Sequence, residues 1–129
     1  LDWKLRNDER VIVKEKTNAR FLSQEIITDQ LDAVVCDASF ISLKKVLPSG
    51  LSFLKKNGWL AALIKPQFEV GKGLVGKGGV VRDAKLHEEV INSICHWLEF
   101  EMKMNLLGIV ESPILGPSGN KEFVVTAKK

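Results

Sequence analysis

The sequence predicts an α/β protein whose sheet is mostly parallel and ends on an antiparallel strand. Short apolar runs alternate with helical segments, which is the usual element order in such a sheet. Two runs, Leu31–Cys36 and Trp59–Ile64, are almost uninterrupted by polar residues, as in parallel strands covered on both faces. The last two runs, Leu106–Glu111 and Glu122–Ala127, are joined by a loop too short for a parallel crossover. The last strand should therefore run antiparallel.

The first half of the chain carries two further predicted elements. The β-branched run Arg10–Lys14 predicts a short strand, and the polar segment Thr17–Gln30 predicts a loop with a short helix. Ser42 can cap a short turn. Because proline is favoured at the first position of a helix, we expect the main helix of this region at Pro48–Asn57, with Gly58 as its stop.

The second half is predicted to hold one long helix. A glycine-rich loop follows the strand Trp59–Ile64 and ends at Arg82, and Asp83 is a good helix N-cap. A helix is expected over Ala84–Met102 because apolar residues recur there at helical spacing, namely Leu86, Val90, Ile94, Trp97 and Leu98. The later segment SPILGPSGN is rich in turn-forming residues.

The composition predicts one soluble, cytoplasmic domain. The chain has 129 residues, of which 45% are hydrophobic and 27% charged, and a net charge of +3 that permits nucleic-acid binding without arguing for it. No apolar run is long enough to span a bilayer. Cys36 and Cys95 lie in apolar surroundings and are expected to be buried thiols. His87 and His96 have no other metal ligands at useful spacing, so no metal site is predicted.

Three charged residues are predicted to meet at one edge of the sheet. Asp37 and Lys65 each follow a buried strand, and Glu122 begins the last one. Ligands of open α/β sheets bind beyond the carboxyl ends of the strands. If the last strand is antiparallel, its start lies at that same edge. A carboxylate–amine–carboxylate cluster could handle protons there, although charges at strand ends are more often solvated or paired.

The glycine-rich loop matches two nucleotide-binding patterns, both out of context. Gly71, Gly73 and Gly76 give G-x-G-x-x-G, and Gly76 with Lys77 completes G-x-x-x-x-G-K. The first pattern should join a strand directly to its helix, and the second requires Ser or Thr where this chain has Gly78. The loop is better interpreted as a mobile basic flap over the site, with Lys72, Lys77 and Arg82 as its charges, or as a solvated loop.

Several long segments resemble one known family. VVCDASFISLKKVLP, LIKPQFEVGKGLVGKGGVVRD and GPSGNKEF, together with KTNARFL, are similar to hallmark segments of the TlyA family. These proteins are often labelled hemolysin A and belong to the FtsJ-like ribosomal RNA methyltransferases. The segments occur in the family's order and the resemblance covers essentially the whole chain.

The resemblance implies a Rossmann-like methyltransferase fold, S-adenosylmethionine as cofactor, and methylation of a ribose 2′-hydroxyl in ribosomal RNA. FtsJ-like enzymes use a Lys-Asp-Lys-Glu tetrad. By motif, Asp37 of CDASF matches its aspartate, Lys65 of IKPQFE its second lysine and Glu122 of GNKEF its glutamate. These are the three residues that the predicted topology brings to one edge, and Lys65 is the candidate base.

The resemblance also implies binding residues. The segment Asp37, Ala38, Ser39 and Phe40 would lie at the methionine end of the cofactor, and Asn18 resembles a contact to its adenine; the alternative role of Asn18 is that of a turn-forming residue in a loop. Lys72, Lys77 and Arg82 could hold RNA phosphates, an interaction that weakens with salt.

The chain resembles only the C-terminal portion of the catalytic domain, over residues 1–129. The family's glycine-rich cofactor loop, first tetrad lysine, first two strands and S4-like RNA-binding domain have no counterpart here. The chain alone is therefore expected to be inactive, and its exposed strand edges predict a homodimer.

Two other functions stay open. The chain could be a non-catalytic RNA- or protein-interaction module that kept the fold. A membrane-lytic protein is disfavoured, because the polar face of the Ala84–Met102 helix is acidic, with Glu88, Glu89, Glu99 and Glu101.

Overall fold

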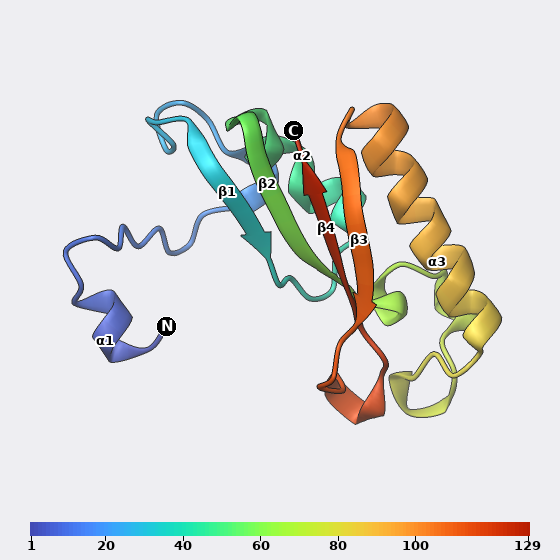
Figure 1. Ribbon diagram of the computed structural model, residues 1–129. Helices are drawn as coiled ribbons and strands as arrows, with labels where there is room; N and C mark the ends of the chain where they lie inside the picture. The colour runs from blue at the N-terminus through green and yellow to red at the C-terminus, as the bar shows by residue number, and fades with distance from the viewer.

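A mixed sheet of four strands organises the chain in the computed structural model, which describes all 129 residues (Figure 1). The strands are β1 (Leu31–Cys36), β2 (Leu54–Ile64), β3 (Asn105–Glu111) and β4 (Phe123–Lys128), in the order β1-β2-β4-β3. β1 pairs with β2 in parallel, whereas β4 is antiparallel to both β2 and β3. Three strands thus run one way and the last runs the other, which confirms the predicted α/β sheet.

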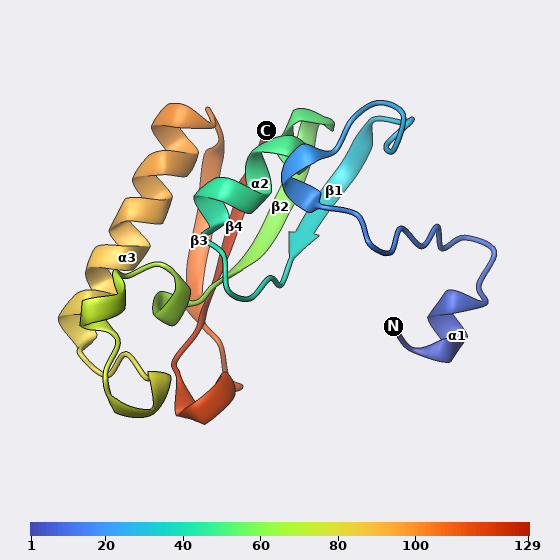
Figure 2. The same ribbon diagram turned by 180° about the vertical axis from the view of Figure 1, so that it is seen from behind.

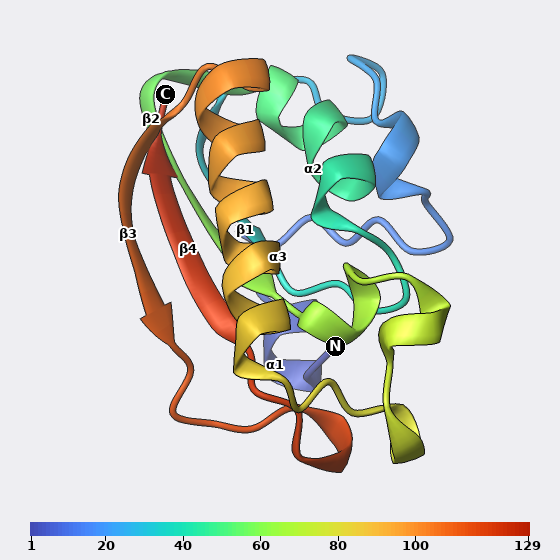
Figure 3. The ribbon, with the colours of Figure 1, turned by 90° about the vertical axis from the view of Figure 1, so that its right-hand side faces the viewer.

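Both long helices lie on the same face of the sheet. They are α2 (Leu43–Ser52) and α3 (Ala84–His96), the latter continuing as a π-helical turn over Trp97–Glu101 (Figures 2 and 3). A third, short helix, α1 (Trp3–Arg6), belongs to an N-terminal segment that extends away from the sheet (Figure 1). The predicted helix Ala84–Met102 therefore agrees with the structure to within one residue.

The core fills the space between the sheet and these helices. Alternate residues of β2 and β4 point into it, among them Leu60, Ile64 and Val125, which are essentially inaccessible to solvent. The helices contribute residues three or four positions apart, namely Leu43, Leu47 and Leu51 from α2 and Val90, Ile94 and Leu98 from α3 with its extension. This packing fixes the ends of β2 and β4, where the candidate site lies.

The opposite face of the sheet has no helix over it. We call it the open face; the pairing registers and the alternation of side chains assign it eleven residues: Ala33, Val35, Trp59, Ala61, Leu63, Asn105, Gly108, Val110, Val124, Thr126 and Lys128. Among them only Lys128, at the end of β4, is charged, and Val35 is 72% exposed and Trp59 47% exposed. A solvated sheet face normally alternates to polar residues, so this mostly apolar face indicates a contact surface.

The open face and the edge strands β1 and β3 should cause the chain to self-associate. We expect the mean mass from light scattering to rise with protein concentration, and Trp59→Lys to lower it at equal concentration, because a charge would have to be desolvated in the contact. Phe21→Lys, on the exposed N-terminal segment, is the matched control and should change nothing. A monomer mass for the unmodified chain at high concentration would contradict the predicted homodimer.

The predicted helix Pro48–Asn57 was placed too late. α2 already begins at Leu43, so Pro48 lies inside it. The beginning is fixed by Ser42 and Glu69, whose side-chain oxygens accept the first backbone N–H groups of the helix. These caps and the core packing of α2 outweigh the hydrogen bond that Pro48 cannot donate.

β2 begins earlier than predicted, at Leu54 rather than Trp59, and Gly58 lies within the strand instead of ending a helix. The register with β1 shifts at this point, so β2 bulges, and Asn57 takes a positive φ of 69°. A Cβ atom at Gly58 would lie 2.8 Å from a backbone oxygen of the bulge. The glycine therefore allows a close backbone approach in a strand, not a helix stop.

The predicted strand Arg10–Lys14 is wrong. Residues 11–14 are irregular and lie in the N-terminal segment that leaves the sheet (Figure 1). β-branched residues favour extended backbone, but a strand also requires a neighbour that accepts and donates its ladder hydrogen bonds. The segment has no such neighbour in the sheet.

Candidate functional site

Lys65 and Asp37 meet just beyond the ends of β2 and β1. Lys65 Nζ lies 2.5 Å from Asp37 Oδ1 and 3.3 Å from Ser39 Oγ. The lysine is only 8% exposed, whereas the Asp37 side chain is 69% exposed. The amine is therefore held inside the edge of the sheet by two acceptors from the loop after β1.

Glu122 lies at the same edge. Ile64 of β2 pairs with Phe123 of β4, so Lys65 and Glu122 occupy the next opposed positions of the two strands. Glu122 is 6% exposed, and its Oε2 accepts a 3.0 Å hydrogen bond from Gln67 Nε2. The structure thus brings Lys65 and Asp37 into contact and places Glu122 beside them, held by a separate partner.

Gly116 forms a wall of the Glu122 site. A Cβ atom on Gly116 would lie 2.3 Å from Glu122 Oε2, although the backbone conformation of this residue suits any amino acid. Glycine is required here because the buried carboxylate packs directly against the backbone. The loop before β4 therefore packs directly against the Glu122 carboxylate.

We expect Gly116→Ala to lower the free energy of unfolding by about 1–3 kcal/mol, because Glu122 must move to accept one extra methyl group. Gly71→Ala is the matched control: its φ is also ordinary and a Cβ atom there meets nothing within 4 Å. Urea unfolding of both variants checks this. Equal free energies of unfolding for the two variants would mean that the Glu122 carboxylate can move without loss of stability.

One short segment after β2 connects the parts of the site. Lys65, Gln67 and Glu69 alternate along it and contact three different places: the Asp37–Ser39 loop, Glu122 and the start of α2. Glu69 accepts from Ser42 Oγ at 2.7 Å and from the backbone N–H of Leu43 at 2.9 Å. Sequence reasoning missed Gln67 and Glu69, although the polar–apolar alternation of KPQFE offered a signal.

The loop after β1 carries the predicted cofactor residues. Ser39 contacts Lys65, and Phe40 has a positive φ of 64°, is 88% exposed and packs its ring 4.9 Å from that of Phe68. Asn18 lies elsewhere: its side chain accepts from Arg20 N and caps the turn Ala19–Phe21, which lies beside α2 (Figure 2). The structure therefore does not bring Asn18 to the Lys65–Asp37 pair.

The glycine-rich loop contains two short 3₁₀ turns, Lys72–Leu74 and Lys77–Gly79, and is tied to the loop before β4. Asn120, 3% exposed, accepts from Val81 N and donates to the carbonyls of Gly79 and Pro117. Both loops lie at the same end of the molecule (Figures 1 and 3). The C-terminal end of the glycine-rich loop is thus held by Asn120 of the loop before β4.

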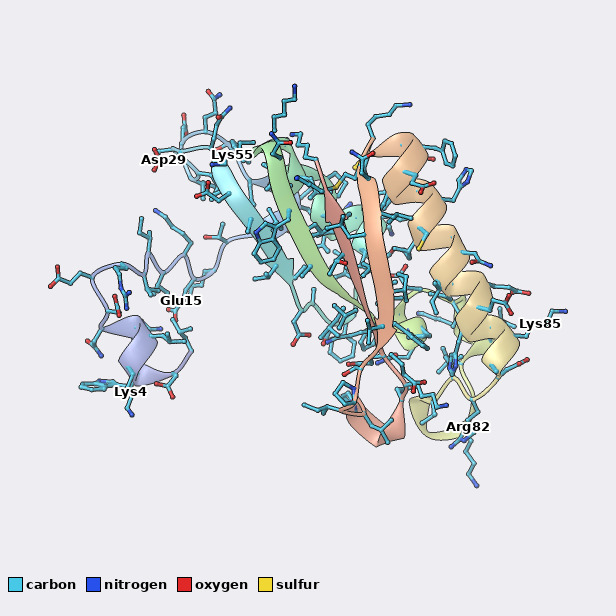
Figure 4. All side chains as sticks on the ribbon, viewed as in Figure 1. Lys4, Glu15, Asp29, Lys55, Arg82 and Lys85 are labelled. Atoms are coloured by element: carbon cyan, nitrogen blue, oxygen red, sulfur yellow. The ribbon has the colours of Figure 1, made fainter.

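The three predicted RNA-binding residues are exposed on this loop. Arg82 points outward from the end of the molecule and donates to the Lys77 carbonyl at 3.1 Å, and Lys72 is likewise exposed (Figure 4). They present positive charge to solvent without forming an ion pair with a protein carboxylate.

Cys36 ends β1 next to the site. Burial and the Asp37 carboxylate raise the pKa of its thiol, and the Lys65 ammonium partly offsets this. Burial and Glu99 likewise raise the pKa of Cys95. Both are free and partly buried, so the expectation of two buried thiols holds only in part.

The two histidines do not form a metal site. His87 is buried, with Nε2 2.7 Å from the Val81 carbonyl oxygen and its ring edge against Phe123. No group of three or more His, Cys, Asp or Glu side chains is placed to hold a metal ion.

None of the helices combines the length and the apolar character that a membrane-spanning helix needs.

Comparison with known proteins identifies the family of this chain. The family model for FtsJ-like methyltransferases matches residues 1–129. The chain belongs to the FtsJ-like methyltransferase family. Among curated proteins it is 46% identical over 123 residues to the 16S/23S rRNA (cytidine-2′-O)-methyltransferase TlyA of Mycobacterium tuberculosis, covering 95% of this chain and 46% of that protein.

Two further FtsJ-like relatives carry the hemolysin name. Hemolysin A of Brachyspira hyodysenteriae is 38% identical, over 96% of this chain and 52% of that protein. The crystal structure of a hemolysin-type protein from Lactococcus lactis superposes with a TM-score of 0.92 at 40% identity, covering 99% of this chain and 61% of that one. The chain therefore spans about half the length of the curated relatives that it matches.

FtsJ-like methyltransferases generally use S-adenosylmethionine, and one hollow of this structure adjoins a candidate site residue. A shallow hollow of about 220 Å³ on the open face is lined by Val35, Ala61, Leu63 and Val124 and adjoins Asp37. Pockets for ligands of that size measure roughly 300–1,000 Å³ and enclose most of the ligand. The hollow next to Asp37 is thus too small and too shallow to enclose that cofactor by itself.

Proposed function

We propose that the protein containing this chain methylates ribose 2′-hydroxyl groups of ribosomal RNA, using S-adenosylmethionine. The observation that carries the proposal is the Lys65–Asp37 contact with Glu122 at the same edge of the sheet, in a chain of the FtsJ-like family. The TlyA relative is named for this reaction.

Lys65 is proposed to accept the proton of the 2′-hydroxyl group. A neutral lysine amine has two N–H groups and one lone pair, and Lys65 Nζ has two acceptors, Asp37 Oδ1 and Ser39 Oγ. Satisfying both N–H groups leaves the lone pair for the hydroxyl proton. With the cofactor bound, the hydroxyl oxygen would bond to the methyl carbon while the methyl–sulfur bond breaks and its electron pair leaves on sulfur. The hydroxyl proton would move to Lys65 Nζ, and Asp37 would stabilise the resulting ammonium.

The cofactor supplies a methyl group on a good leaving group, so the protein mainly orients the reactants. We propose that Asp37, Ala38, Ser39 and Phe40 line the methionine end of the cofactor, next to the hollow on the open face. Asn18, which caps a turn beside α2, remains a proposed contact to the adenine of the cofactor.

Lys72, Lys77 and Arg82 are proposed to bind RNA phosphates. Their exposure and positive charge suit a backbone contact that needs no base specificity. Such contacts release counterions, so RNA affinity should fall with rising salt.

Calorimetry with S-adenosylmethionine tests the proposal. We expect the full-length protein to bind the cofactor and to transfer a labelled methyl group to ribosomal RNA. This chain alone should bind weakly or not at all, because the hollow next to Asp37 is too small and too shallow to enclose the cofactor. If the full-length protein failed to bind, a methyltransferase function would be excluded.

A non-catalytic interaction module is the second candidate, and the mostly apolar open face favours it. It predicts RNA or protein binding by a full-length protein that neither binds the cofactor nor transfers a methyl group. The same experiment therefore separates the two functions.

A further inference from the structure

The side-chain amide of Gln67 donates a hydrogen bond to the buried carboxylate of Glu122. Gln67 is 9% exposed and Glu122 6% exposed, and Nε2 donates to Oε2 over 3.0 Å. A buried carboxylate without a partner is costly, and a hydrogen bond to a charged group is stronger than one between neutral groups. The position of the Glu122 carboxyl group therefore depends on the residue at position 67.

Gln67 is itself held rigidly with respect to Lys65. The segment after Lys65 forms a 3₁₀ turn in which Phe68 N donates to Lys65 O at 2.8 Å and Val70 N to Pro66 O at 3.1 Å. Glu69 anchors the same segment to the start of α2. Local structure thus fixes the backbone of Gln67 relative to that of Lys65, and the hydrogen bond to Glu122 orients the amide.

The other end of the amide lacks a partner. Gln67 Oε1 is the one buried side-chain nitrogen or oxygen atom in the structure without a hydrogen bond. An unpaired acceptor is unfavourable in a protein interior. The amide of Gln67 thus supplies one donor to Glu122 and leaves one unpaired acceptor in the buried site.

We propose that Gln67 is a positioning residue, which fixes the Glu122 carboxyl group opposite Lys65 during methyl transfer; this rests on the function proposed above. An amide suits the task in either protonation state of Glu122. Nε2 donates to the carboxylate, and after a half-turn of the amide Oε1 accepts from the protonated carboxyl group. Leucine can do neither, and glutamate cannot donate to a carboxylate unless it is protonated.

The first test uses this chain and needs no activity. In ¹H–¹⁵N spectra, the side-chain NH₂ signals of Gln67, assigned by their loss in Gln67→Leu, should shift in Glu122→Gln and exchange slowly with solvent. Unshifted, rapidly exchanging signals would overturn the proposal.

The second test measures methylation kinetics in the full-length protein. Gln67→Leu and Gln67→Glu should each lower kcat by about 10–100-fold, the equivalent of one charged hydrogen bond. KM for RNA and for the cofactor should change less than about threefold, because neither ligand is bound by Gln67. Gln30→Leu, at an exposed position, is the matched control and should match the unmodified protein.

The outcomes separate the two proposals. An unmodified protein without methyltransferase activity would remove the proposed function, while the NMR signals would still decide whether Gln67 holds Glu122. Normal kcat in Gln67→Leu of an active protein would overturn the positioning role alone.

Discussion

Alanine in place of Lys65 should abolish RNA methylation by the full-length protein while leaving its affinity for S-adenosylmethionine nearly intact. A positioned proton acceptor contributes roughly 10²–10⁴-fold to the reaction rate. Lys65 is the residue whose amine contacts both Asp37 and Ser39, so no second lysine can replace it there. The measurement is transfer of a labelled methyl group at saturating RNA and cofactor, with calorimetry for the affinity.

Lys85→Ala provides the control for a lost lysine. Lys85 is exposed at the start of α3 and points to solvent, far along the molecule from the N-terminal segment (Figure 4). This variant should keep full activity. Retained activity in Lys65→Ala would refute the assignment of Lys65 as the base, and lost cofactor affinity would reassign it to binding.

Removing the side chain of Asn120 should lower the free energy of unfolding by about 2–4 kcal/mol, because each buried polar group left without a partner costs roughly 1–3 kcal/mol. The alanine variant loses the acceptor for Val81 N and the donor to Gly79 O and Pro117 O. Chemical unfolding measures the loss, and limited proteolysis should show earlier cleavage in the glycine-rich loop.

Asn92→Ala is the matched control, since Asn92 is exposed on α3 and alanine is a good helix former. It should change stability by less than about 0.5 kcal/mol. An Asn120→Ala protein as stable as this control would show that the two loops do not depend on each other.

The fold was predictable where local pattern and burial agree. Leu31–Cys36 and Trp59–Ile64 are apolar because both contribute to the core, and Ala84–Met102 repeats apolar residues because α3 covers the same core. The antiparallel direction of β4 follows from the length of the loop before it. These elements in turn place Asp37, Lys65 and Glu122 at one edge of the sheet.

The predictions that were wrong or missing depend on residues that are far apart in the sequence. α2 begins at Leu43 partly because Glu69, 26 residues later in the chain, accepts its first N–H group, and no local pattern reveals this cap. Arg10–Lys14 has strand-like residues without a strand to pair with. Gln67 and Asn120 act through partners 55 and 39 residues away in sequence, so their importance becomes visible only when the loops meet.

The place of β4 in the sheet has a consequence for how the chain acquires its structure. β4 is the last of these four strands to be synthesised, yet it lies between β2 and β3, and β3 pairs with no other strand of the sheet (Figure 1). Until Phe123–Lys128 has left the ribosome, β2 lacks one neighbour and β3 lacks any. Contacts between distant parts of a chain also form slowly. The sheet, and with it the Glu122 site, should therefore assemble only after translation of the segment is complete, exposing the nascent chain to chaperones until then.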